Sequence, residues 1–195
     1  MLSMYFFMSK KIKAINFIIF CCFFLNIISS ISQTQTPVKS TSPTIIPLDN
    51  LIQYEKARLI PPIVLEDSLG NEINLDEFIG NLIIINFWAT WCKPCEEEMP
   101  SLDNLSQNKN FENLIILPVN MEKINYEKTK EFFSVLNIKK LKIFFDPNLN
   151  FVKELKLTGV PTTVIINKRG KEFARIIGSI DFEDKKFLKW LSDYD

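Results

Sequence analysis

The chain contains no histidine among its 195 residues. Without an imidazole it cannot form a Ser-His-Asp or Cys-His catalytic group, an HExxH zinc site or a Cys₂His₂ finger. An excess of basic residues is missing as well, because 23 lysines and arginines balance 23 aspartates and glutamates. The charge balance therefore gives no sign of nucleic-acid binding, and any chemistry must use groups other than imidazole.

Cysteine is also scarce, with four residues in two close pairs, too few for a small domain held together by disulfides. Cys21 and Cys22 lie in an apolar run and are interpreted as small membrane residues. Cys92 and Cys95 form a CxxC motif, which suits a redox dithiol or half of a zinc site. Zinc needs two more soft ligands, and the chain offers only the membrane cysteines. We therefore predict no metal site and favour a redox dithiol over zinc or an inert pair.

The N-terminal residues have the pattern of an export signal. An uncharged, mostly apolar run over residues 15–31 follows a cluster of three lysines, Lys10, Lys11 and Lys13. A helix needs about 20 residues to span a bilayer core of about 30 Å, so this run spans only with its flanks. We predict that residues 1–32 form a signal anchor; the alternative is a signal peptide cleaved near Ser30-Ile31-Ser32.

The lysine cluster predicts a cytoplasmic N-terminus and an exported body. We expect a single-pass protein of the cytoplasmic (inner) membrane with its domain on the periplasmic side, or a soluble periplasmic protein if the signal is cleaved. Residues 33–59 are predicted to form a tether, because their first half is rich in Ser, Thr, Gln and Pro. Residues 48–59 are expected to form a short amphipathic helix, and residues 60–195 the folded domain.

Apolar patterns in residues 60–195 alternate between strands and helices. The run 82–88 is nearly all apolar and predicts a central strand buried on both faces. Further strands are expected at 63–66, 72–75, 114–120, 141–145, 162–167 and 172–178, and helical segments at 76–79, 94–106, 126–136, 149–155 and 181–191. This order predicts an α/β fold in which a mixed sheet is covered by helices on both faces and preceded by a β-hairpin.

The CxxC motif lies where the central strand passes into a helix. The free N–H groups and the positive end of the helix dipole stabilise a thiolate there, and Lys93 adds a cation. Pro94 suits the first helical turn because its missing N–H has no partner to lose. We therefore expect Cys92 to be the exposed nucleophile and Cys95, one turn further in, to be the buried resolving thiol.

Two motifs resemble one protein family. Residues 86–95 (NFWATWCKPC), followed by EEEMP, resemble the active-site strand and helix of the exported, usually membrane-tethered thioredoxin-like proteins of the TlpA, ResA and CcmG group. Residues 159–163 (GVPTT) resemble the cis-proline loop of that family. The resemblance covers about residues 60–195. It implies a thioredoxin-like fold and thiol-disulfide exchange on the outer side of the cytoplasmic membrane.

The resemblance also implies partners. These are client proteins with disulfides or thiols, commonly cytochrome c precursors or oxidase-assembly factors, and a membrane thiol reductase that donates electrons. No cofactor is expected. A stabilised Cys92 thiolate would itself favour an oxidising potential, whereas the resemblance favours a reductant, so the sequence leaves the direction of electron flow open.

Glu98 matches the acidic residue that this family places near the dithiol. Three positions after Cys95, it is expected to lie on the same helical face, partly buried with a raised pKa, and to exchange protons with Cys95. The alternative is a solvated acid of the first helical turn. Asn86 stands where cytoplasmic thioredoxins carry a buried aspartate, which puts that internal base in doubt and directs attention to Glu98.

Three more residues are expected to bind the client. A cis bond before Pro161 would turn the Val160 backbone toward an extended substrate, and Trp91 is expected to shield the sulfur and contact partners. Two other functions remain as alternatives. A copper-delivery module needs ligands beyond two thiols, normally a histidine, and a thiol peroxidase usually lacks a resolving cysteine two residues from the reactive one.

Overall fold

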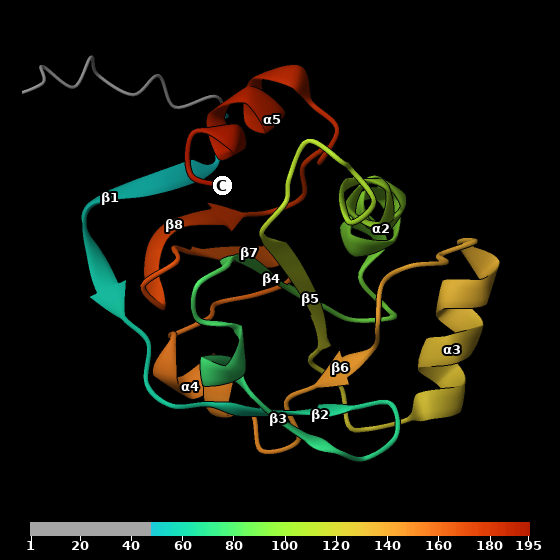
Figure 1. Ribbon diagram of the computed structural model, residues 1–195. Coiled ribbons are helices and arrows are strands. Elements are labelled where there is room, and N and C mark those ends of the chain that lie inside the picture. The colour runs from blue at the N-terminus through green and yellow to red at the C-terminus, as the bar shows by residue number, and fades with distance from the viewer. Residues whose placement is uncertain (1–47) are drawn as a thin grey trace, which may run out of the picture. The chain divides into compact units, whose positions relative to one another are not determined.

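The computed structural model describes residues 48–195, whose strands form one mixed sheet (Figure 1). Eight strands follow the order β1-β8-β7-β4-β5-β6-β2-β3 within this part of the chain. The strands are β1 Leu51–Leu59, β2 Val64–Asp67, β3 Glu72–Asn74, β4 Leu82–Trp88, β5 Leu114–Asn120, β6 Phe144–Phe145, β7 Thr162–Ile166 and β8 Lys171–Ile177. The predicted mixed sheet is confirmed.

The centre of the sheet is β4, all seven residues of which are buried. It pairs in parallel with β5 and antiparallel with β7. Because side chains alternate across a strand, Leu82, Ile84 and Trp88 enter one apolar core while Ile83 and Phe87 enter the other. Burial on both faces is what the continuous apolar run of this segment requires.

Helices cover both faces, as predicted. The helical elements are η1 Leu75–Phe78, α2 Lys93–Leu105, α3 Tyr126–Val135, α4 Asn150–Glu154 and α5 Lys185–Ser192. Buried side chains of α2, α3 and α5 fill one core, and those of η1 and α4 fill the core on the opposite face. The last helix begins later than the expected residue 181, because the Asp184 side chain accepts the N–H groups of Lys186 and Phe187 and caps it there.

The predicted helix over residues 48–59 is wrong, since Leu51–Leu59 forms the edge strand β1. This strand pairs antiparallel with β8, from Leu51 opposite Ile176 to Leu59 opposite Lys171. The outer edge of β8 would otherwise leave its backbone N–H and C=O groups without strand partners, and tertiary pairing of this kind overrides a weak local helical pattern. The sheet therefore includes residues that the sequence assigned to the tether.

The predicted hairpin ahead of the central strand is confirmed. Strands β2 and β3 pair antiparallel, and β2 also pairs with β6. The Asp67 carboxylate accepts the N–H groups of Leu69 and Asn71 and so closes the turn. In residues 48–195, no helix has the length and apolar character to cross a membrane. The predicted anchor, residues 1–32, lies outside the described residues.

Candidate active site

Cys92 and Cys95 form a disulfide at the start of α2. Their Cα atoms are 5.3 Å apart. Cys92 is the N-cap residue of the helix, and its sulfur accepts the N–H of Cys95 at 3.3 Å. An N–H group at the positive end of a helix dipole stabilises negative charge on that sulfur once the disulfide is reduced. The predicted place of the motif, at the strand-to-helix junction, is confirmed.

The exposure of the two cysteines partly corrects the prediction. Cys95 is fully buried, as expected, but Cys92 is only 4% exposed in the disulfide form. Its side chain turns toward Cys95 and belongs to the apolar core that includes Trp88 and Ala89. Trp91 is the exposed neighbour, with 72% of its surface accessible. The indole of Trp91 is therefore the exposed side chain beside the buried disulfide.

Lys93 does not act as a free cation beside the sulfur. Its ammonium group forms an ion pair with Glu96 at 2.9 Å, and hydrogen bonding to Glu96 raises the pKa of Lys93. Both side chains are well exposed to solvent, where such pairs contribute little. The helix terminus is therefore the main source of positive potential at Cys92.

The peptide bond between Val160 and Pro161 is cis, as predicted. Strand β7 starts at the next residue, and Thr162 lies opposite Phe87 of β4. Continuing this register places Pro161 beside Trp88, at the end of the sheet where the redox loop leaves β4. The structure thus brings the two separate sequence motifs to one end of the sheet. Val160 is half-buried there.

Glu98 is buried, with 3% of its surface exposed, so the interpretation as a solvated acid is wrong. One carboxylate oxygen, Oε1, accepts the Asn86 side-chain N–H at 2.8 Å, and Oε2 accepts the backbone N–H of Ile180 at 3.2 Å. Burial raises the pKa of Glu98 to about 7, although the two hydrogen bonds oppose the rise. A carboxyl group with such a pKa takes up and releases a proton near neutral pH.

A cleft of about 300 Å³ connects this carboxyl group with the surface. It is lined by Glu97, Glu98, Ser101, Ser179, Ile180 and Asp181. Glu97 and Asp181 are exposed, so the outer part of the cleft is polar and open to water. Glu98 therefore lies at the inner end of a cleft whose outer residues are in contact with solvent.

The buried Asn86 joins Glu98 to the neighbouring strand. Its Nδ2 group donates both to Glu98 Oε1 and to the hydroxyl oxygen of Thr163, at 2.8 and 3.0 Å. Its other polar atom, Oδ1, is buried and has no hydrogen-bond partner among the described residues. The sequence singled out Asn86 only as a departure from thioredoxins and gave no sign of this bridge.

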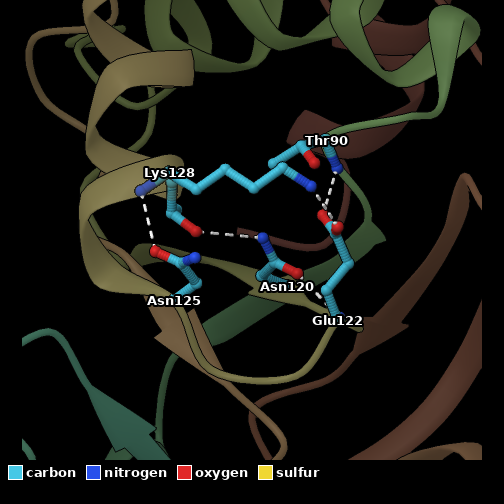
Figure 2. Close-up of polar contacts among 6 residues, drawn as sticks. Thr90, Asn120, Glu122, Asn125 and Lys128 are labelled. Atoms are coloured by element: carbon cyan, nitrogen blue, oxygen red, sulfur yellow. Dashed lines mark hydrogen bonds and ion pairs between the residues drawn. The ribbon is translucent and has the colours of Figure 1, made fainter.

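Sequence reasoning missed Glu122, which fastens the redox loop (Figure 2). Its carboxylate accepts the backbone N–H of Thr90 at 2.6 Å and the ammonium group of Lys128 at 2.7 Å. Burial alone would raise the pKa of Glu122, but the hydrogen bonds from Lys128 and Thr90 outweigh it and hold the pKa below its usual value. Thr90 is two residues before Cys92, so Glu122 ties the loop to helix α3.

Neighbouring amides hold Glu122 itself in place. The Asn120 side chain accepts the backbone N–H of Glu122 at 2.7 Å and donates to the hydroxyl of Thr129 at 3.2 Å. Figure 2 also shows Asn125, whose side chain caps α3 by accepting the N–H of Lys128. These polar side chains follow a strand end in no recognisable motif, so the sequence carried no signal for them beyond a run of polar residues.

A groove of about 460 Å³ lies beside the redox loop. Its apolar lining includes Trp91, Phe132 and Val135, and its charged lining consists of Glu96, Glu131 and Lys128. Val135 is 77% exposed and Trp91 72%, so two large apolar side chains of this groove face solvent next to the dithiol. In residues 48–195, no group of three acidic or cysteine side chains is placed to hold a metal ion.

A dithiol at a helix N-terminus, a buried acid behind it and a cis-proline beside it define the thioredoxin-fold class of thiol-disulfide oxidoreductases. The family model described as Redoxin matches residues 55–187, and the chain belongs to this family. The predicted enzyme class, thiol-disulfide oxidoreductase, is confirmed by its relatives.

The relatives share the activity in their names. The chain is 36% identical over 128 residues to the thiol-disulfide oxidoreductase ResA of Geobacillus thermodenitrificans. The aligned residues make up 65% of this chain and 71% of the relative. It is 30% identical over 138 residues to ResA of Bacillus thuringiensis subsp. konkukian, covering 70% of this chain and 79% of the relative.

Solved structures support the fold alone. A thiol:disulfide interchange protein DsbE described as putative, from Chlorobium tepidum, superimposes with a TM-score of 0.60 at 22% identity, over 70% of this chain and 98% of that one. StoA from Bacillus subtilis superimposes with a TM-score of 0.56 at 22% identity, over 67% of this chain and 96% of that one. The predicted thioredoxin-like fold is confirmed.

Proposed function

We propose that this oxidoreductase is a protein-disulfide reductase, tethered to the outer side of the cytoplasmic membrane, that reduces client proteins in cytochrome c maturation or oxidase assembly. The observation that carries the thiol-disulfide exchange is the Cys92–Cys95 disulfide at the N-terminus of α2 with Glu98 buried on the same helix. The reducing direction rests on the resemblance to the membrane-tethered thioredoxin-like group. The tether rests on the sequence of residues 1–32, which follows the pattern of a signal anchor. A soluble periplasmic form after cleavage is the alternative location.

The reaction begins with the reduced dithiol. The Cys92 thiolate attacks one sulfur of a client disulfide, forms a mixed disulfide, and the other client sulfur leaves as a thiolate. Glu98 takes the proton of Cys95, whose sulfur then attacks the Cys92 sulfur and releases the second client thiolate. Two electrons pass to the client, and the chain is left with the Cys92–Cys95 disulfide. A membrane thiol reductase must then restore the dithiol.

The surroundings of the dithiol support a protein client rather than a small molecule. The groove beside Trp91 is open and apolar along α3, with charges of both signs at Glu96, Glu131 and Lys128, which suits a polypeptide with apolar side chains near its cysteine. The half-buried Val160 lies at the same end of the sheet, where its backbone is available to an extended segment.

Trapping of clients tests the proposal. A Cys95→Ser variant, expressed as the full chain in cells, is expected to accumulate mixed disulfides between Cys92 and client proteins. A reductant should cleave these mixed disulfides. The matched control is Cys92→Ser, which is expected to trap nothing, because the nucleophile is gone while Cys95 stays buried. Full in-cell activity of Cys92→Ser, or no mixed disulfide with Cys95→Ser, contradicts the proposal.

The same cells test the direction of electron flow. If the chain is a reductant, acid quenching followed by alkylation is expected to show wild-type Cys92 and Cys95 mainly as free thiols. Loss of the membrane electron donor should convert them to the disulfide. A chain that is fully oxidised in growing cells with an intact donor would be an oxidant, and the reducing role would be wrong.

A further inference from the structure

Asn86 occupies a bridging position inside the protein. It lies on β4 directly opposite Thr163 of β7, and Glu98 reaches the pair from α2. The Asn86 Nδ2 group has two hydrogens, and both are used, one toward Glu98 Oε1 and one toward the Thr163 hydroxyl oxygen. All three side chains are buried.

This arrangement satisfies the ionised form of Glu98 and leaves Asn86 incomplete. The Oδ1 atom of Asn86 is buried without a partner in the described part of the chain. Buried carbonyl oxygens nearly always accept a hydrogen bond, because removal from water without one is costly. The orphaned oxygen belongs to the same amide that donates to Glu98 and Thr163, so a rotation that exchanges the two amide atoms would present an acceptor to both partners.

Protonation turns Glu98 from a group that only accepts hydrogen bonds into one that also donates a hydrogen bond. Oε2 faces the backbone N–H of Ile180, so the proton enters on Oε1, on the side of Asn86. An O–H and an N–H group would then face each other as two donors. Rotation of the Asn86 amide by 180° replaces Nδ2 with Oδ1, which accepts from the Glu98 O–H and from the Thr163 hydroxyl. Each arrangement contains two hydrogen bonds and one unpartnered amide atom.

We infer that the Asn86 side-chain amide rotates as Glu98 gains or loses its proton, which makes Asn86 a positioning residue for the proton exchange of Cys95. The inference rests on the proposed role of Glu98. The proton moves from the Cys95 sulfur to Glu98 Oε1 and leaves through the cleft beside Ser101. An aspartate in place of Asn86 offers only acceptors while ionised, and a leucine offers nothing.

Other charges near Glu98 must be considered in any test of pH dependence. Glu97 from α2 and Asp181 from the loop after β8 line the cleft with Glu98, and both are acids. Cys92 and Cys95 titrate when reduced, but they carry no titratable proton in the disulfide form. In the disulfide form, Glu98, whose pKa burial raises to about 7, is therefore the group to follow in this cluster.

The test is NMR of the disulfide form of the full-length chain, purified in detergent and labelled with ¹⁵N-asparagine and ¹³C-glutamate. At pH 8.5 the two Asn86 amide protons are expected to show nuclear Overhauser contacts to Glu98 and Thr163 side-chain protons. At pH 5.5 both contacts should disappear, and both amide protons should move upfield as their acceptors are lost. The midpoint must coincide with that of the Glu98 carboxyl carbon.

The control is Glu98→Gln, whose carboxamide does not titrate, so the Asn86 signals should no longer depend on pH. If they still change with the same midpoint, Glu97 or Asp181 drives the change and the inference is wrong. It is also wrong if the Glu98 carboxyl carbon titrates while the Asn86 contacts stay the same. Failure of the proposed role of Glu98 appears separately, as a resolving step by Cys95 whose pH profile is unaltered in Glu98→Gln.

Discussion

Glu98 lies on the buried side of α2 with Cys95, and its burial has a cost for the folded protein. The folded state keeps the proton of Glu98 up to about pH 7, whereas an unfolded chain releases it near 4.5. The folded state therefore binds more protons between these values, and stability falls as pH rises through them. The loss of folding stability is complete above pH 7 and absent below pH 4.5. The buried acid of the site therefore lowers the free energy of unfolding of the protein at neutral and higher pH.

A Glu98→Gln variant is expected to be more stable than wild type at pH 8, by about 1–3 kcal/mol, because an uncharged group replaces a buried carboxylate. The difference should vanish at pH 4, where both side chains are neutral. Urea unfolding of the full-length chain at the two pH values measures the effect. Equal stabilities at pH 8 would mean that the carboxylate is solvated well enough to remain charged without penalty.

Glu122 is a second single residue that supports the site, because its carboxylate binds the Thr90 N–H and the Lys128 ammonium group. Glu122→Ala is expected to cost about 1–3 kcal/mol of stability, since a half-buried N–H and a cation lose a charged acceptor. It should also slow exchange by misplacing the loop before Cys92. Glu122→Gln keeps an acceptor for Thr90, so more of the exchange rate should survive in this matched control than in Glu122→Ala.

Among the elements, those with a strong local pattern were predicted and those formed by distant pairing were not. The short apolar run of β4, bounded by turn residues, favours a buried strand, and a CxxC with Pro94 at a strand end favours the start of a helix. Strand β1 has no such pattern: its place depends on the free edge of β8, more than a hundred residues away. The Glu122 contacts likewise join segments that no local spacing relates.

Strand β8 carries an ion pair that joins three elements. The Arg175 guanidinium binds the buried Glu172 carboxylate at 2.7 and 3.1 Å and also donates to the backbone carbonyl of Leu155 after α4, while the Tyr54 hydroxyl of β1 donates to Glu172. Removal of one partner leaves a buried charge uncompensated, which is far worse than removal of both.

Arg175→Met is therefore expected to destabilise the protein by about 3–5 kcal/mol. The double variant Arg175→Met with Glu172→Met should recover most of this loss, because no unpaired carboxylate remains. Thermal and urea unfolding of both variants check the prediction. If the double variant is less stable to unfolding than Arg175→Met alone, the ion pair contributes net stability to the sheet and the prediction is wrong.

At the scale of the whole molecule, the site combines parts that are separate in sequence but meet at one end of the sheet. The CxxC follows β4, the cis-proline precedes β7, and Ile180, which binds Glu98, follows β8. The sequence could supply the two motifs and their order. It could not supply the Asn86–Glu98–Thr163 bridge, because that contact exists only once α2, β4 and β7 have packed.

The proposed location is tested on the full chain in its host. We expect residues 60–195 to be digested by protease added to spheroplasts, and the intact chain to remain with membranes after a carbonate wash. A chain lacking residues 1–32 should stay inside the cell and be protected. Recovery of the wild-type chain from the soluble periplasmic fraction would indicate a cleaved signal instead of an anchor.

The start of β1 lies level with the redox centre. Leu51 is opposite Ile176, which is opposite Thr163, which is opposite Asn86, so one row of residues crosses the sheet from its outermost strand to the Asn86–Glu98–Thr163 bridge. The polypeptide therefore enters the domain at the end that presents the sulfurs. Pairing of β1 with β8 thus fixes the first residues of the folded domain at the same end of the sheet as the disulfide.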